Sequence, residues 1–188
     1  MKRDLALECL KAHITDEDIV VAVYQACFDW MVINPRDLNY VSTGAMGQAS
    51  SHGLGLALSN PDRRVIVFDG DGSLLMNLGS LVSVAGAAPR NFYHFLFFNG
   101  VYEVNGAHPI PGQDRVDFQA MAKAAGYRSA EKFSELDELE ESASRIFGAD
   151  GPAFVELRIE PGASYPRDYA FIHSPQTRER FRKALNRN

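Results

Sequence analysis

Apolar residues recur along the chain in two patterns, as short continuous runs and as longer stretches with helical spacing. Four stretches have the length of a strand and are rich in β-branched or aromatic residues, at 19–23, 65–68, 92–98 and 153–159, and the apolar run is continuous over 19–23, 65–68 and 95–98. Runs without polar interruptions are typical of strands that are buried on both faces of a parallel sheet. A shorter strand is predicted at 38–41.

Helical spacing and end signals predict helices between these strands. We expect them at 4–13, 26–33, 73–88, 118–125, 134–147 and in the tail from 174, with a glycine-bearing helix inside 42–58. Asp117 is a candidate N-cap, and Ser134 opens a capping-box pattern. Strands that alternate with helices predict an α/β fold with a mostly parallel, doubly wound sheet, and we expect residues 1–188 to form one domain.

Two polar residues follow buried runs at places where a parallel sheet binds ligands. Asp71 lies in Gly70-Asp71-Gly72-Ser73 directly after one apolar run, and Asn99 follows the next. The carboxyl ends of parallel strands meet at one edge of a sheet, so both side chains are expected there. An acid and an amide beside the N–H groups and partial positive charge of a helix start suit Mg²⁺ that holds a phosphate, with a backbone carbonyl of the next turn as a further ligand. Gly72 would let the phosphate approach, and Ser73 would add a hydroxyl.

Composition narrows the classes of function. The 188-residue chain has a net charge of -5, which gives no reason to expect binding to nucleic acid or an anionic membrane. Only two cysteines are present, far apart, so they cannot form a zinc or iron–sulfur site alone and are expected to be core residues of a reduced, cytoplasmic protein. No apolar run approaches the length of a membrane span. The basic residues near the C-terminus are expected to form the solvated face of a last helix.

The spacing of the central motif resembles that of thiamine-diphosphate (ThDP) enzymes. In that family GDG is followed by some two dozen residues and an Asn, and here 26 residues (73–98) separate Gly72 from Asn99. The resemblance implies a three-layer α/β/α fold, with Mg²⁺ held by Asp71, Asn99 and the carbonyl of Val101. The segment Gly44-Ala45-Met46-Gly47 is similar to the segment that contacts the cofactor's pyrimidine. The carbonyl of Gly44 would then accept a hydrogen bond from the aminopyrimidine, and Met46 would bend the cofactor.

Three segments resemble the diphosphate-binding half of sulfopyruvate and phosphonopyruvate decarboxylases more narrowly. They are GAMGQASSHGLGLAL, the GDGS unit and NGVYEVNGAHPIPG. The loop after Asn99 departs from the relatives' usual NGxYxSTGGQPT, which leaves the exact 2-oxo acid substrate open. Tyr102 of this loop is a candidate cofactor contact, although it and Glu103 could simply order the loop. Cofactor contacts are therefore expected from Gly44, Ala45, Met46, Gly70, Asp71, Gly72, Ser73, Asn99, Val101 and Tyr102.

The resemblance also implies a partner. Complete ThDP enzymes need a pyrimidine-binding domain that carries an activating Glu, and a chain of 188 residues filled by one sheet domain has no room for it. We therefore expect a cofactor-anchoring subunit without the activating Glu, in a homo- or hetero-oligomer, with an exposed apolar face where the partner docks.

Other polar residues are weaker candidates. His52 is expected to be a satisfied core histidine, whereas His108, in the loop after Asn99, is a candidate for substrate contact or proton transfer. Three residues near the C-terminus could meet an anionic substrate tail, although a surface role is favoured: Arg167, His173 and Arg178.

Alternative functions stay open. A ThDP-dependent carboligase resembling acetolactate synthase would use the same site, and a non-catalytic binding module would keep only the fold. Ferredoxin-linked oxidoreductases of the wider family are disfavoured, because their β chains carry cluster-binding cysteines. A dinucleotide-binding dehydrogenase is discounted, because no complete GxGxxG follows a first strand.

Overall fold

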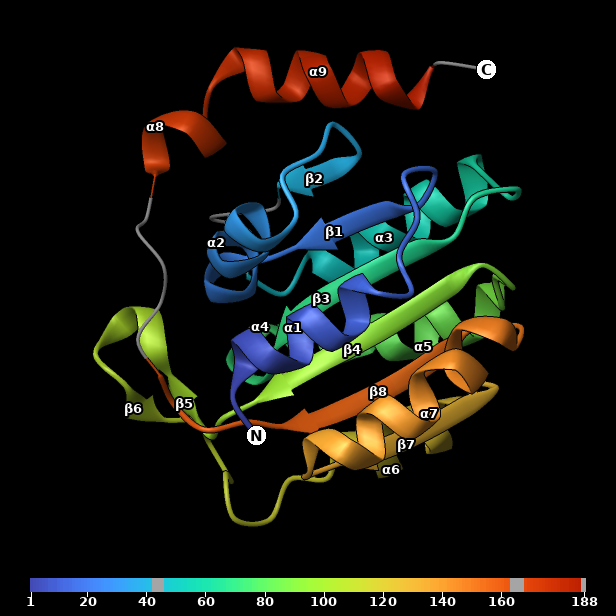
Figure 1. Ribbon diagram of the computed structural model, residues 1–188. Coiled ribbons are helices and arrows are strands. Elements are labelled where there is room, and N and C mark those ends of the chain that lie inside the picture. The colour runs from blue at the N-terminus through green and yellow to red at the C-terminus, as the bar shows by residue number, and fades with distance from the viewer. Residues whose placement is uncertain (42–45, 163–167, 187–188) are drawn as a thin grey trace.

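A six-stranded parallel sheet forms the centre of the computed structural model, which describes residues 1–41, 46–162 and 168–186 (Figure 1). The strand order is β2-β1-β3-β4-β8-β7, and each neighbouring pair is parallel. The strands are β1 Ile19–Ala22, β2 Asn39–Val41, β3 Val65–Gly70, β4 Phe92–Phe98, β7 Ser129–Phe133 and β8 Ala153–Arg158. The predicted parallel α/β sheet is confirmed.

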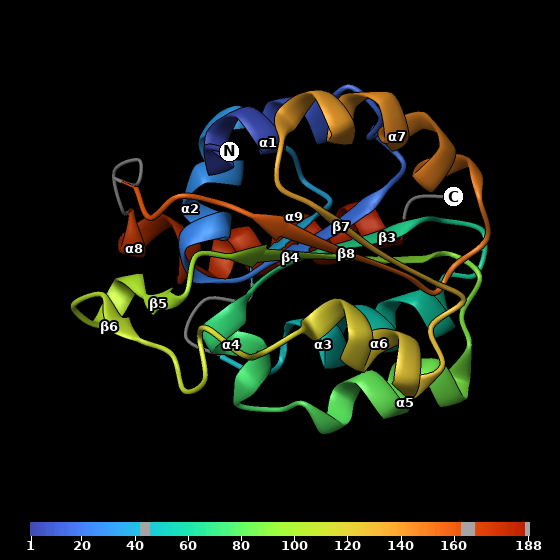
Figure 2. The same cartoon turned by 90° about the horizontal axis from the view of Figure 1, so that it is seen from below.

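Helices cover both faces of the sheet and one edge. On one face lie α1 (Arg3–Lys11), α2 (Tyr24–Ile33) and α7 (Leu136–Gly148) (Figure 2). The opposite face carries α3 (Ala49–Ser59), α4 (Asp71–Leu75), α5 (Gly79–Ala87) and α6 (Phe118–Ala125). The C-terminal α9 (Pro175–Leu185) follows the short α8 (Tyr169–Ile172) and packs against edge strand β2, where the rings of Phe181 and Tyr40 lie 5.2 Å apart.

The central strands are buried on both sides because two layers of helices cover them. In β3, Ile66 and Phe68 join the core under α1, α2 and α7, whereas Val65 and Val67 join the core under α3, α5 and α6. This alternation explains the uninterrupted apolar runs in the sequence. Trp30 is fully buried, and its indole N–H donates to Asn39 Oδ1 at 2.8 Å.

The predicted N-cap of α6 is confirmed, whereas two other predictions about helix ends are wrong. Asp117 caps α6 by accepting from the Ala120 N–H. The single helix predicted at 73–88 is instead two helices, α4 and α5. The capping box at Ser134 is also wrong, because the N-cap of α7 is Glu135 and its side chain makes no capping bond. Strand β7 was not predicted, since its polar sequence SAEKF lies half-buried at the edge of the sheet.

The segment 99–114 contains regular structure where a loop was expected. Strands β5 (Val101–Tyr102) and β6 (His108–Pro109) pair antiparallel, and the 3₁₀ turn η1 (Glu103–Asn105) joins them. We call residues 101–109 the hairpin. It projects from the carboxyl edge of the sheet, beyond the end of β4.

The two cysteines and the basic residues of the last helix can be compared with their expected positions. Cys27 is buried, whereas Cys9 is half-buried and packs against the same core. Arg178, Arg180, Arg182 and Lys183 are exposed on α9, as predicted for a solvated face. Within the described ranges, none of the helices has both the length and the apolar character needed to cross a membrane.

Candidate functional site

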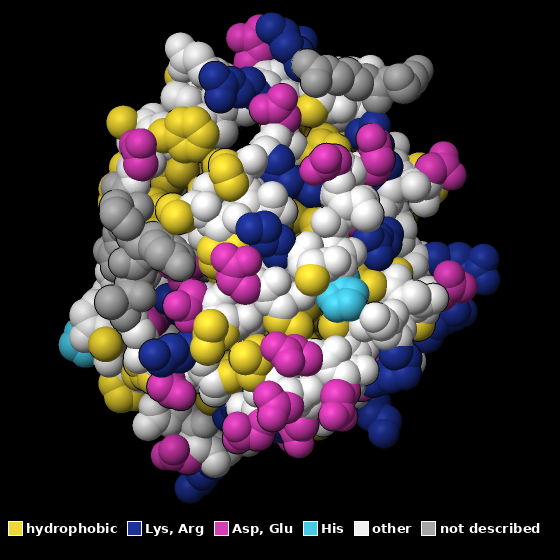
Figure 3. Space-filling view, viewed as in Figure 1, with side chains coloured by type: hydrophobic (Ala, Val, Ile, Leu, Met, Phe, Trp, Pro, Cys, Tyr) yellow, Lys and Arg dark blue, Asp and Glu magenta, His cyan; other side chains and the backbone are white. Residues whose placement is uncertain are grey.

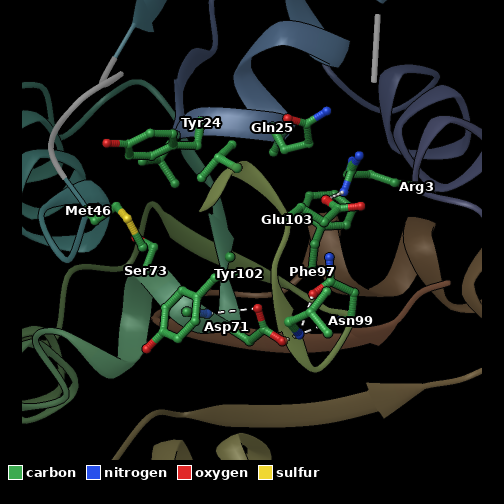
Figure 4. A pocket seen from close by; sticks show the side chains of 16 residues that line it. Arg3, Tyr24, Gln25, Met46, Asp71, Ser73, Phe97, Asn99, Tyr102 and Glu103 are labelled. Carbon is green, nitrogen blue, oxygen red and sulfur yellow. Dashed lines mark hydrogen bonds and ion pairs between the residues drawn. The ribbon is translucent and has the colours of Figure 1, made fainter. Parts of the chain in front are cut away.

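A cleft of about 460 Å³, partly open to solvent, lies at the carboxyl ends of β1, β3 and β4 (Figure 4). Its lining includes eight of the ten residues that the sequence predicts for a cofactor site: Met46, Gly70, Asp71, Gly72, Ser73, Asn99, Val101 and Tyr102. The other two, Gly44 and Ala45, lie outside the described residues. Residues far apart in the sequence thus converge at the predicted edge of the sheet.

Asp71 is a buried carboxylate held by backbone N–H groups. Its Oδ1 accepts from Gly72 N at 2.7 Å, and its Oδ2 accepts from Asn99 N at 3.0 Å and from Gly100 N at 2.7 Å. Burial raises the pKa of Asp71 to about 6. The three N–H groups oppose this rise in pKa, and the nearby charge of Glu103 adds to it. Because burial disfavours the charged form of Asp71, a bound cation would stabilise its carboxylate.

Asn99 lies beside Asp71 at the end of β4. Its Oδ1 accepts from Val101 N at 2.9 Å, and Val101 itself lines the cleft. A carboxylate or amide oxygen has two lone pairs, so Asp71 Oδ1 and Asn99 Oδ1 each keep one beyond the hydrogen bond they accept. Two hard oxygen donors with spare lone pairs in a partly dry cleft fit a divalent cation such as Mg²⁺.

Ser73 connects two of the predicted segments. Its hydroxyl accepts from Gly47 N at 3.0 Å, and the side chain of Asn77 donates to the Gly47 carbonyl at 2.9 Å. Gly47 has φ +78, in the left-handed region that glycine adopts without strain. These bonds fix the turn that places Met46 in the lining of the cleft.

Tyr102 of the hairpin packs against the central glycine turn. Its ring covers Gly72, where an added Cβ would stand 2.5 Å from two ring carbons. Gly72 is therefore needed for close approach of the Tyr102 ring, whereas the sequence analysis expected it to admit a phosphate.

The start of α2 contributes residues that the sequence analysis missed. Tyr24 and Gln25 line the cleft directly after β1. Tyr24 has φ +45, which strains a residue with a side chain, and Gln25 Oε1 is buried without a hydrogen-bond partner. Both features are typical of functional sites. Their position after the buried run 19–23 is a signal that could have identified them.

The first turn of a longer helix, α2, lines the cleft at the same place. No side chain caps the start of α2, which has ten residues, whereas α4 has only five. The expected partial positive charge therefore comes mainly from α2, because the dipole of a single short turn is small.

Glu103 and Arg3 line the same cleft and bind each other. Arg3 Nη1 lies 2.6 Å from Glu103 Oε2, and Arg3 Nε lies 2.5 Å from Asp29 Oδ2. Glu103 Oε1 accepts from Gly162 N at 2.8 Å. Glu103 was an open candidate, but Arg3 was not predicted, because nothing in its local sequence marks it.

The remaining candidates that the structure describes lie outside the lining of the cleft. His52 is half-buried on α3 against the ring of Tyr40, and burial lowers its pKa. His108, His173 and Arg178 are exposed, and Arg167 lies outside the described residues. The described residues include no cluster of three or more His, Cys, Asp or Glu placed to hold a metal, so the candidate cation ligands are the carboxylate of Asp71 and the amide oxygen of Asn99.

A profile of the family described as thiamine pyrophosphate enzyme, C-terminal TPP binding domain, matches residues 21–157. Phosphonopyruvate decarboxylase from Streptomyces viridochromogenes is 39% identical over 162 residues, which are 86% of this chain and 40% of that protein. Sulfopyruvate decarboxylase subunit beta from Methanothermobacter thermautotrophicus is 34% identical over 162 residues, 86% of this chain and 84% of that subunit.

The fold also matches a solved structure. A ThDP-dependent 4-hydroxybenzoylformate decarboxylase from Rhodococcus jostii RHA1 superposes with a TM-score of 0.71 at 20% identity. The superposition covers 87% of this chain and 33% of that one. The chain spans less than half the length of the phosphonopyruvate decarboxylases it matches, but most of the length of the sulfopyruvate decarboxylase beta subunit.

Proposed function

Because the chain belongs to the thiamine pyrophosphate enzymes, through their C-terminal TPP-binding domain, we propose that it is the cofactor-anchoring subunit of a 2-oxo acid decarboxylase. Sulfopyruvate and phosphonopyruvate are the model substrates, taken from the names of its relatives. In this proposal the whole chain acts as one diphosphate-binding domain. The observation that carries it is the convergence of Asp71 and Asn99, each with a spare oxygen lone pair, in one cleft.

Mg²⁺ is proposed to be held by Asp71 Oδ1, Asn99 Oδ1 and the carbonyl of Val101. The diphosphate would lie on the cation and toward the uncapped N–H groups of α2, where a helix start favours an anion. Gln25 lies on the first turn of α2 and would gain polar partners from a bound ligand or its water. Gly70, Gly72 and Ser73 would form the floor of this subsite, and Tyr102 would form one wall.

The other end of the cofactor is proposed to lie on the segment 44–46. Met46 lines the cleft in a turn that Ser73 and Asn77 hold in place, which supports its expected role as the side chain that bends the cofactor. The proposed contacts of Gly44 and Ala45 belong to the part of this segment outside the described residues.

Bound ThDP supplies the electron sink for loss of CO₂ from a 2-oxo acid. The activating carboxylate is proposed to come from a partner chain. Of the two acids in the described lining, Asp71 is proposed as a metal ligand, and both oxygens of Glu103 are already engaged by Arg3 and Gly162. A Glu from a pyrimidine-binding partner would complete the site.

A docking face for that partner is supported by the outer surface next to α4 and α5. Residues 72–88 include no charged residue, and Met76 and Val82 are 56% and 64% exposed. The opposite face of the sheet differs, because acidic side chains gather over α7 (Figure 3). An uncharged helix surface with exposed apolar side chains favours a protein partner over solvent.

The test is to purify the native complex from its source and to assay CO₂ release from a panel of 2-oxo acids. Release that depends on ThDP and Mg²⁺ supports the proposal, and the preferred acid names the substrate. Carbon–carbon bond formation between two oxo acids would favour a carboligase instead. If the native complex, with the partner present, neither binds ThDP nor turns over any 2-oxo acid, the proposal is overturned.

A further inference from the structure

The carboxylate of Glu103 is bound by two segments, one near the N-terminus and one after β8. Arg3 on α1 pairs with its Oε2 at 2.6 Å, and Gly162, beyond β8, donates its N–H to Oε1 at 2.8 Å. Both residues lie outside the range 21–157 that matches the family profile. The hairpin beside the cleft is therefore held by two segments that lie outside the matched range, one before it and one after it.

The N-terminal segment that carries Arg3 and the segment after β8 that carries Gly162 are hydrogen-bonded to each other. The N-terminal ammonium of Met1 donates to the Arg158 carbonyl at 3.2 Å, and Glu160 N donates to the Met1 carbonyl at 2.9 Å. Arg3 is only 6% exposed and is anchored from its other side by Asp29 on α2. A buried guanidinium with two carboxylate partners has little freedom to move, so Arg3 is a fixed point.

The hairpin needs such a fixed point because its own bonds are few. Each of its strands has two residues, and an isolated two-stranded hairpin is marginally stable. Tyr102 and Glu103 are neighbours whose side chains point in opposite directions, one toward Gly72 and the other toward Arg3 (Figure 4). Holding the Glu103 side chain against Arg3 therefore keeps the Tyr102 ring over Gly72 and sets the position of Val101.

We propose that Arg3 and Glu103 form a clamp that positions the hairpin against the cofactor cleft. Glu103 is then a positioning residue and not a proton donor, because both of its oxygens are engaged. The role of the clamp in cofactor affinity rests on the proposed function, whereas its hold on the hairpin depends only on the contacts described.

The test compares Glu103→Gln and Arg3→Met with a matched control, Asp18→Asn, in the full chain. Asp18 is also a buried carboxylate that accepts from an arginine (Arg64) and from a backbone N–H (Thr15), but it precedes β1, at the opposite edge of the sheet. Hydrogen exchange of the amides in 101–109 is followed by mass spectrometry. Melting temperatures are recorded for all three variants.

Both clamp variants should exchange faster than the unmodified chain in the hairpin, whereas Asp18→Asn should lower the melting temperature without that local change. In the native complex, the clamp variants should bind ThDP with Mg²⁺ about 10- to 100-fold more weakly, as expected when support for a ligand is removed. Unchanged exchange in both clamp variants, or equal acceleration in the control, would overturn the clamp.

The two proposals fail separately. Absence of ThDP binding in the unmodified native complex overturns the proposed function, while the exchange data still decide whether the clamp exists. Faster exchange with unchanged ThDP affinity overturns the positioning role toward the cofactor.

Discussion

The ring of Tyr102 lies directly over Gly72, so closely that a Cβ at position 72 would stand 2.5 Å from Cδ1 and Cε1 of the ring. The two residues come from different strand ends, Gly72 from the turn after β3 and Tyr102 from the hairpin after β4. Their contact joins the two halves of the candidate metal site. Position 72 therefore cannot carry a side chain unless the Tyr102 ring moves.

Replacing Gly72 by Ala should displace Tyr102 and destabilise the chain by about 1–3 kcal/mol, the usual range for overpacking. In a Tyr102→Ala background the same replacement should have much less effect, which a double-mutant cycle by urea denaturation would measure. Gly55→Ala is the control, because nothing lies within 4 Å of an added Cβ on this helical glycine. It should stabilise the chain by about 0.5–1 kcal/mol. Equal losses from Gly72→Ala in both backgrounds would show that the ring does not limit position 72.

The carboxyl group of Asp71 should titrate near pH 6 in the cofactor-free chain, since burial raises its pKa to about 6 from an ordinary value of 3.8. Between these values the folded state binds more protons than the unfolded state. The contribution of Asp71 to the free energy of unfolding therefore falls as pH rises through this window, by no more than roughly 3 kcal/mol. Carbon NMR of the labelled carboxyl group measures the titration, and a midpoint below 4 would contradict it.

Tyr24 should reverse the usual ranking of alanine and glycine in helices. At φ +45 a side chain is strained, so Tyr24→Gly should be more stable than Tyr24→Ala by about 1 kcal/mol. Both variants lose the ring, so their difference isolates the backbone. At position 55, inside α3, alanine should instead be the more stable residue. Urea denaturation of these variants compares the two positions, and a preference for alanine at both would contradict the strain at Tyr24.

Ser73 should act on the turn at 46–47 as well as on any ligand. Loss of the bond from Gly47 N in Ser73→Ala should destabilise the chain by about 1 kcal/mol and speed exchange of the Gly47 amide. Ser83→Ala on the exposed surface of α5 is the control and should leave that amide unchanged. Slow exchange at Gly47 in Ser73→Ala would argue against this role.

Local patterns in the sequence were sufficient to predict five of the six strands of the sheet and the sheet edge at which Asp71 and Asn99 meet. Buried apolar runs marked β1, β3, β4 and β8, and the residues after two of those runs gave Asp71 and Asn99. Strand β7 escaped because an edge strand that is half-buried does not need an apolar run. The break between α4 and α5 was missed because the only poor helix former in Met76–Leu78 is Asn77, and a single Asn disfavours a helix only weakly.

Contacts between distant segments could not be predicted from one sequence. Arg3 reaches Glu103 across 100 positions, and Arg3 lies in no motif that would mark it as part of the site. Tyr24 was overlooked because its strain is a property of its backbone angle and not of its residue type. Ser73 also has a contact that its sequence does not announce, a hydrogen bond from Gly47 N that holds the turn at 46–47.

The most direct test of the account is calorimetric titration of the native complex with ThDP, in Mg²⁺ and again in EDTA. Asn99→Ala and a control, Asn105→Ala at an exposed position in the 3₁₀ turn of the hairpin, are titrated in the same way. The account predicts binding only with Mg²⁺, weakened at least about tenfold by Asn99→Ala and unchanged by Asn105→Ala. Equal binding in Mg²⁺ and EDTA, or full affinity in Asn99→Ala, would contradict a cofactor anchored through a metal at Asp71 and Asn99.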